Sequence, residues 1–180
     1  MNPTVPKGLV DGIHVYCLSA LLMLCCSAVF NGFAWSKQHL RLLQLADHTG
    51  ILCLICGSYT PMMVTAGAHQ LLALNWTAAC FSFTVKALGS RLDSVWLHVP
   101  LFVLMGWSVV SIWDEFWSFF SDWAKQRSVV AGLLYTGGLL PWGFNRLEGH
   151  NALWHVFVLA GSAAFYSVVL LELSQRGKSQ

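Results

Sequence analysis

The chain has 180 residues, of which 56% are hydrophobic and only 10% charged, and its formal net charge is +2. An ordinary globular domain carries roughly 25% charged residues, so this composition excludes a typical soluble enzyme or binding module. The small net charge and the lack of a basic patch interleaved with aromatic residues argue against nucleic acid as a partner. The sequence therefore predicts an integral, multi-pass membrane protein whose partner is membrane lipid.

Apolar runs long enough to cross a bilayer recur along the whole chain. The hydrocarbon core requires a helix of about 20 predominantly apolar residues. By this measure the sequence predicts an all-α integral membrane bundle, with residues 1–180 forming a single transmembrane domain. The six predicted transmembrane helices cover residues 10–34, 46–66, 69–88, 93–113, 127–145 and 150–173.

The flanks of these runs bear on topology. The first run exceeds the apolar region of about 7–15 residues in a secretory signal, so we expect it to stay in the membrane. The connection from Trp113 to Lys125 is aromatic and acidic, which is typical of the membrane interface. Lys and Arg divide equally between the two sides of the predicted bundle. Lys37 and Arg41 after the first helix outnumber Lys7 before it, which favours termini outside the cytosol.

The cysteines all fall inside apolar runs. Cys53 and Cys56 form a C-x-x-C pair, which suggests thiol or metal chemistry on a redox fold. In a membrane helix, small and apolar packing residues are the favoured interpretation of this pair. The six cysteines are Cys17, Cys25, Cys26, Cys53, Cys56 and Cys80.

Polar residues within membrane helices are costly, so they are candidates for function. Because the first helix ends on the side where the second and sixth begin, such residues can form one cluster near one membrane face. Two ligands spaced i, i+4 with an acid from a neighbouring helix are typical of a metal site. The alternative is structural, with Asp47 and Asn151 as helix N-caps and His155 as a packing residue. The pairs concerned are Ser27 with Asn31, Asp47 with His48, and Asn151 with His155.

Several strings resemble the hemolysin III and progestin/adiponectin receptor (PAQR) family. L-A-D-H-T-G-I-L-C-L-I-C-G-S-Y-T-P (Leu45–Pro61) is similar to its third helix, and H-N-A-L-W-H-V-F-V-L-A-G-S-A-A (His150–Ala164) to its last. G-L-L-Y-T-G-G (Gly132–Gly138) resembles the helix before that, and S-A-V-F-N (Ser27–Asn31) stands in place of the family's S-x-x-x-H. The resemblance runs from Tyr16 to Leu173. It implies a seven-helix fold, of which the six helices here correspond to helices 2–7.

The resemblance also implies a zinc site. In the family, one His from S-x-x-x-H and two from a late H-x-x-x-H hold the ion, and an Asp supports the metal-bound water. Carried over residue by residue, the three His positions fall on Asn31, Asn151 and His155, while Asp47 and Ser27 are kept. A neutral amide oxygen is a poor zinc ligand. We therefore expect zinc, the implied cofactor, to bind weakly.

Three functions follow from these features. The first is a receptor-like or lipid-binding family member with a degenerate zinc site and a small lipid ligand. The second is a zinc-dependent membrane hydrolase of ceramide-type lipid amides, with Asp47 and Ser27 as catalytic residues. The third is a transporter or channel that uses the polar cluster. Whether the chain is an enzyme stays open between these alternatives.

Overall fold

Helices make up almost all of the chain that the structure, a computed structural model, describes. The described residues are 7–33, 39–114, 118, 120–144, 146 and 148–173, and they contain no strand. The long helices are α1 (Lys7–Phe33), α2 (Leu40–Ala66), α3 (His69–Ala87), α4 (Val95–Gly106), α6 (Asp122–Gly143) and α7 (His150–Val168). Two short elements, η1 (Ser108–Ile112) and η2 (Val169–Leu173), follow α4 and α7.

Length and hydropathy confirm the predicted all-α membrane protein. Within the described residues, four stretches are long and apolar enough to cross a bilayer. The helices α3, with 19 residues, and α6, with 22, are similar in length but more polar. The chain is therefore an integral, multi-pass membrane protein. The four apolar stretches are Gly8–Gly32, Leu40–Ala66, Val95–Ile112 and His150–Leu171.

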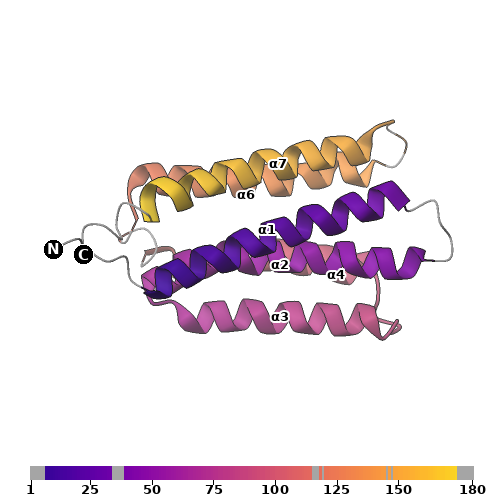
Figure 1. Ribbon diagram of the computed structural model, residues 1–180, viewed down its shortest axis with the longest axis horizontal. Coiled ribbons are helices and arrows are strands. Elements are labelled where there is room, and N and C mark those ends of the chain that lie inside the picture. The colour runs from indigo at the N-terminus through magenta and orange to yellow at the C-terminus, as the bar shows by residue number, and fades with distance from the viewer. Residues whose placement is uncertain are drawn as a thin grey trace. The chain divides into compact units, whose positions relative to one another are not determined.

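The chain divides into two compact units. One holds residues 6–111 and the other mainly residues 112–180. In the first unit α2 is central, because it packs against α1, α3 and α4. In the second unit α6 packs along α7. The labelled ribbons of α1 and α2, and those of α6 and α7, run side by side (Figure 1).

Small residues bring α1 and α2 into close contact. A Cβ added at Gly57 would lie 2.5 Å from the Cβ of Ser19, and one added at Gly50 would lie 2.9 Å from the Cα of Met23. Position numbers rise along α1 as they fall along α2, so the two helices are antiparallel. Close backbone approach at small residues is a common way for membrane helices to associate, because lipid gives no hydrophobic drive between them.

The core of the first unit lies between α2, α3 and α4. Its buried residues are Leu52, Cys56, Ala79 and Met105. The Cys56 thiol donates a hydrogen bond to the carbonyl oxygen of Asn75 at 3.4 Å. The cysteine at the end of the C-x-x-C pair is therefore a packing residue in this structure, as its membrane context predicted.

Side chains from α2 and α3 form hydrogen bonds to the residues where the α-helix α4 ends. The α-helix ends at Gly106, and a 3-10 turn continues from Ser108. The hydroxyl of Tyr59 on α2 donates to the carbonyl of Gly106, and the amide of Asn75 on α3 donates to the hydroxyl oxygen of Ser108 at 2.8 Å. Such partners satisfy backbone and side-chain groups that a helix break exposes within a membrane.

In the second unit, aromatic residues fill the space that glycines leave. The ring of Tyr135 lies 3.2 Å from the place where Gly161 would carry a Cβ. The Tyr135 hydroxyl shares a hydrogen bond of 2.8 Å with the hydroxyl of Ser162. On the same pair of helices, Gly138 lies against Trp154 and Phe157. Thus α6 and α7 also associate through small residues, with one polar contact to fix their register.

Three helices begin earlier than predicted, and one of them is α1, which begins at Lys7 rather than at 10. The helix α2 begins at Leu40 rather than at 46, and α6 begins at Asp122 rather than at 127. Ser121 caps α6, because its hydroxyl oxygen accepts from the backbone N–H of Ala124 at 3.3 Å. The apolar runs mark only the part of a helix that faces lipid, and a polar extension can be equally helical. Part of the predicted interfacial connection, residues 115–117 and 119, and also Lys37, lie outside the described residues.

Candidate functional site

Ser27 and Asn31 occupy the last turns of α1. The side-chain amide of Asn31 donates to the carbonyl oxygen of Ser27 at 2.8 Å and approaches the hydroxyl oxygen of Ser27 at 3.4 Å. Ser27 is buried, whereas Asn31 is exposed. The i, i+4 spacing therefore places the two predicted residues together, and the Asn31 amide is engaged with its own helix.

Asp47 lies within α2, about two turns after its first residue. The interpretation of Asp47 as an N-cap is therefore wrong, since the helix begins at Leu40 after His39. Gly50, one turn further on, faces Met23 of α1, so the antiparallel register puts Asp47 at the level of Ser27. The structure thus brings the predicted acid and serine to the same end of the α1–α2 pair.

Asn151 and His155 lie in the first turns of α7, in the second unit. The His155 ring donates through Nδ1 to the carbonyl oxygen of Asn151 at 2.6 Å, because a carbonyl can only accept. The N-cap of α7 is Gly149, whose φ is 76°, so the interpretation of Asn151 as a cap is also wrong. The two predicted residues share one face and one hydrogen bond.

The donor atoms at these positions do not fit a tight zinc site. In the first unit the positions supply the carboxylate of Asp47 and the amide of Asn31, and in the second the imidazole of His155 and the amide of Asn151. Structural and catalytic zinc sites use three or four ligands drawn from His, Cys and carboxylates. Within each unit, no three or more described His, Cys, Asp or Glu residues are grouped so as to hold a metal ion.

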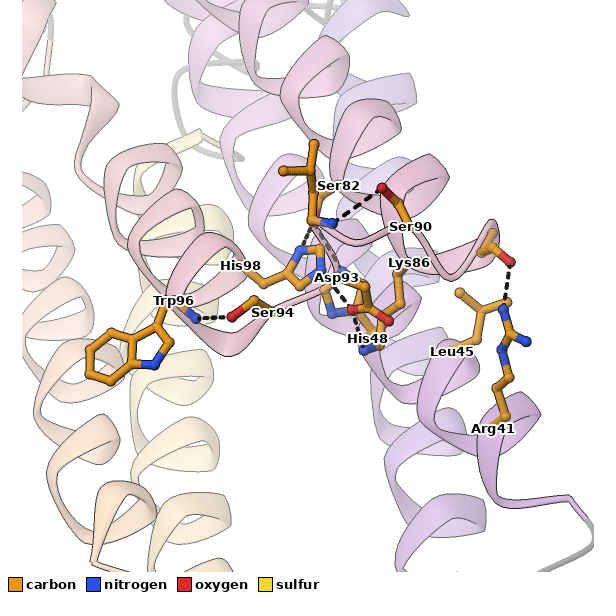
Figure 2. A network of polar contacts seen from close by, with 12 residues as sticks. Arg41, Leu45, His48, Ser82, Lys86, Ser90, Asp93, Ser94, Trp96 and His98 are labelled. Carbon is orange, nitrogen blue, oxygen red and sulfur yellow. Dashed lines mark hydrogen bonds and ion pairs between the residues drawn. The ribbon is translucent and has the colours of Figure 1, made fainter.

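A different polar network lies in the first unit, between α2, α3 and α4 (Figure 2). The Nε2 atom of His48 lies 3.0 Å from the Oγ of Ser82, and that oxygen lies 2.8 Å from the Nδ1 of His98. The Nε2 of His98 lies 3.1 Å from the Oδ1 of Asp93, to which Lys86 also donates at 3.2 Å. We call these residues, His48, Ser82, His98, Asp93 and Lys86, the histidine–serine chain.

The inner members of this chain are almost fully shielded. The exposed fraction is 0% for Ser82, 4% for His98 and 7% for His48. The two imidazole rings meet edge to face with centroids 4.5 Å apart, and Phe102 covers them at 5.1 Å from His48. Polar groups buried to this extent are normally hydrogen-bonded in native proteins. Within the described residues, no buried side-chain nitrogen or oxygen lacks a hydrogen-bond partner.

The outer end of the histidine–serine chain is an ion pair at the surface. Burial raises the pKa of the Asp93 carboxyl, but the hydrogen bonds and positive charge of Lys86 and His98 outweigh it and hold that pKa below its ordinary value. Asp93 is therefore a carboxylate near neutral pH. An ionised carboxylate only accepts hydrogen bonds, so the Nε2 of His98 carries the proton that it shares with Asp93.

Local sequence explains why Asp93 and His98 meet. The turn after α3 has Gly89 at φ 59°, and the backbone N–H of Ser90 closes it on the carbonyl of Val85. Arg41 of α2 donates to the carbonyl of Ala87 at 3.3 Å, where a cation suits a helix C-terminus. Ser94 then caps α4, so His98 falls in the first turn beside the connection.

Sequence reasoning missed most of this network. His48 was noted only as the neighbour of Asp47, and Ser82, Asp93 and His98 were not singled out. One signal was available, because His98 is a lone ionisable residue in the apolar run V-W-L-H-V-P-L-F-V-L-M-G. Ser82 gives no comparable signal, since a single serine in a membrane helix is common.

The fold and these polar groups define a helical, multi-pass membrane protein with buried ionisable residues near helix ends. Comparison with known proteins then identifies the family. The Haemolysin-III related family model matches residues 10–166, and the chain belongs to this family.

Two curated relatives are similar over most of the chain. The Hemolysin-3 homolog of Bacillus subtilis (strain 168) is 27% identical over 161 residues, which cover 87% of this chain and 74% of the relative. Hemolysin-3 of Bacillus cereus is 28% identical over 165 residues, which cover 89% of this chain and 74% of the relative. No solved structure matches the chain.

Proposed function

We propose that this chain is a receptor-like, lipid-binding member of its family that works without a tightly held zinc ion. One observation carries the proposal: two of the three positions where the family resemblance implies zinc-binding histidines are Asn31 and Asn151. The amide of Asn31 is hydrogen-bonded within α1, to Ser27. A neutral amide does not replace an imidazole as a zinc ligand, so the ligand proposed for these polar positions is a lipid headgroup or a similar small molecule.

The metal content of the purified protein tests the first half of this proposal. Elemental mass spectrometry of the detergent-purified chain is expected to find far less than one zinc per chain. Asn31 is exposed, so Asn31→His places an imidazole there without displacing core residues. The double variant Asn31→His/Asn151→His is expected to retain zinc, and each single variant to retain less.

Lipid binding tests the second half. Thermal unfolding is measured with increasing amounts of single purified lipids, because a ligand that binds only the folded state raises stability with its concentration. Asp47→Asn and Ser27→Ala are expected to reduce the response to the binding lipid. Near-stoichiometric zinc in the unmutated chain, with release of fatty acid from a ceramide that Asp47→Ala abolishes, would instead support the amide hydrolase.

The names of the relatives favour a second candidate function. Both are called hemolysins, so lysis or permeabilisation of a bilayer is a function to test for this chain. Release of an entrapped dye from vesicles is the measurement, with protein-free detergent as control. Release that follows the amount of folded chain would support permeabilisation, and a response equal to the control would leave lipid binding as the proposed function.

A further inference from the structure

The hydrogen bonds of the histidine–serine chain run in one direction. Asp93 accepts from Nε2–H of His98, so the Nδ1 of His98 has a lone pair. The only hydrogen that can fill the 2.8 Å contact to this lone pair is the hydroxyl hydrogen of Ser82. The oxygen of Ser82 then accepts from Nε2–H of His48 at 3.0 Å. Every link points outward, from His48 on α2 to the carboxylate at the surface.

We infer that His98 is a proton-binding site, and that a proton bound at its Nδ1 reverses the hydrogen bonds of the chain as far as His48. A protonated imidazole is a donor at both nitrogens. The hydroxyl of Ser82 can then no longer donate to His98, and it turns to accept from Nδ1–H. The protons balance when one is taken up at the Nδ1 of His48, the hydrogen on the Nε2 of His48 passes to the oxygen of Ser82, and the hydroxyl hydrogen of Ser82 passes to the Nδ1 of His98. His48 thereby changes from the Nε2–H to the Nδ1–H tautomer, and the Ser82 hydroxyl now donates to its Nε2.

Three titratable or charged groups face His98 from the elements that pack around it. They are His48 from α2, Lys86 from α3, and Asp93 from the connection before α4. The carboxylate of Asp93 stabilises a positive imidazole at 3.1 Å, while Lys86 opposes it from the other side of the same oxygen. The Asp93 side chain, at the outer end of the histidine–serine chain, is 28% exposed.

The close packing of the two imidazole rings favours reversal of the hydrogen bonds over protonation of His98 without a tautomer change at His48. Without a tautomer change, N–H groups from a cationic and a neutral imidazole would both point at the oxygen of Ser82, with ring centroids only 4.5 Å apart. In a helix, the Nδ1–H tautomer can also donate to a backbone carbonyl of the preceding turn. His155 donates Nδ1–H to the carbonyl four residues earlier, and Gln44 holds the equivalent position for His48.

The consequence is a link between the pH at one face of the first unit and the side-chain arrangement on α2. Lowering the pH from about 8 to 5 spans the range in which histidine changes its charge. In the reversed arrangement His48 is neutral as before, and only the position of its hydrogen differs. His48 adjoins Asp47 on α2, but adjacent residues of a helix point to different faces, and the other members of the histidine–serine chain lie away from the zinc positions in sequence.

Nitrogen-15 NMR of histidine-labelled protein in detergent micelles tests the inference. The ring signals are assigned with His48→Gln and His98→Gln. As the pH falls, His98 is expected to take up a proton, and the signals of His48 are expected to exchange from the Nε2–H to the Nδ1–H pattern at the same midpoint. A His98 that stays neutral to pH 5, or a His48 that keeps Nε2–H while His98 titrates, would overturn the reversal.

Two serine variants establish that Ser82 transmits the change. In Ser82→Ala the tautomer of His48 is expected to stop following the charge of His98, whereas Ser82→Thr, which keeps the hydroxyl, is expected to restore the link. Ser58→Ala is the matched control, because Ser58 is also buried but donates to the carbonyl of Ile55 instead. An unchanged coupling in Ser82→Ala would show that the hydroxyl plays no part. If the alanine variant does not fold, His98→Gln decides whether the charge of His98 drives the change, because His48 is then expected to keep its Nε2–H pattern as the pH falls.

Discussion

The contact between Gly57 and Ser19 allows a sharp test of how α1 and α2 associate. A Cβ added by Gly57→Ala would lie 2.5 Å from the Cβ of Ser19 and 2.4 Å from its Oγ. Carbon atoms pack at about 3.5–4.0 Å, so the two helices must separate by about 1 Å. The hydroxyl can rotate away, but the Cβ is fixed to the backbone. Overpacking of this kind costs about 1–3 kcal/mol, and we expect Gly57→Ala to lower the free energy of unfolding by that amount.

The assay is the free energy of unfolding from an SDS titration in mixed micelles, followed by circular dichroism. Gly32→Ala is the control, because its added Cβ meets no atom within 4 Å and alanine is the better helix former. Ser19→Gly removes the clashing carbon. In a double-mutant cycle, Gly57→Ala should therefore cost less in the Ser19→Gly background than alone. Equal costs in both backgrounds, or a Gly57→Ala variant as stable as Gly32→Ala, would refute the close approach of the two helices.

Three further predictions concern other parts of the chain. Gly89→Ala should lower the free energy of unfolding by about 1 kcal/mol or more, because φ is 59° there and the new Cβ would meet the guanidinium of Arg41. Arg41→Ala should relieve the clash with the guanidinium but not the backbone strain. The depressed pKa of Asp93 contributes stability that is present above about pH 4, the ordinary range of Asp, and is lost as the pH falls through the lower folded value. Unfolding titrations at pH 6 and pH 3 should therefore show Asp93→Asn less stable than the unmutated chain at pH 6, with a smaller difference between the two at pH 3. Tyr135→Phe should lose about 0.6–1.7 kcal/mol through the bond to Ser162, and the loss should be smaller when it is measured in a Ser162→Ala background.

The sequence predicted the fold well because hydropathy reports directly on the part of each helix that faces lipid. It missed the first residues of α2 and α6, since Arg41 and Gln44, or Asp122 and Lys125, lower hydropathy without breaking a helix. Charged side chains near a helix end reach the membrane surface, so a helix can continue well past the apolar run. Helix bounds therefore differ from span bounds for a physical reason.

The candidate site likewise contains residues that the sequence revealed and residues that it did not. Asn31 and Asp47 could be found because they stand in strings that resemble a family. The histidine–serine chain could not, since it depends on which faces of three helices meet and on a connection that returns Asp93 beside His98. Neither spacing nor composition shows which faces of the three helices meet. A lone histidine in an apolar run identifies one member of such a network, but its partners come from tertiary packing.

The D-H dipeptide on α2 shows how one helix serves two sites. Successive residues in an α-helix are rotated by about 100°, so adjacent side chains cannot share a face. Asp47 lies one turn before Gly50, which faces α1, while His48 contacts Ser82 and His98 on the side of α3 and α4. His48 is therefore unable to replace a lost ligand beside Asp47 without abandoning a buried hydrogen bond. The proposed loss of a zinc ligand at Asn31 on α1 and the buried histidine–serine chain between α2, α3 and α4 are thus separate matters.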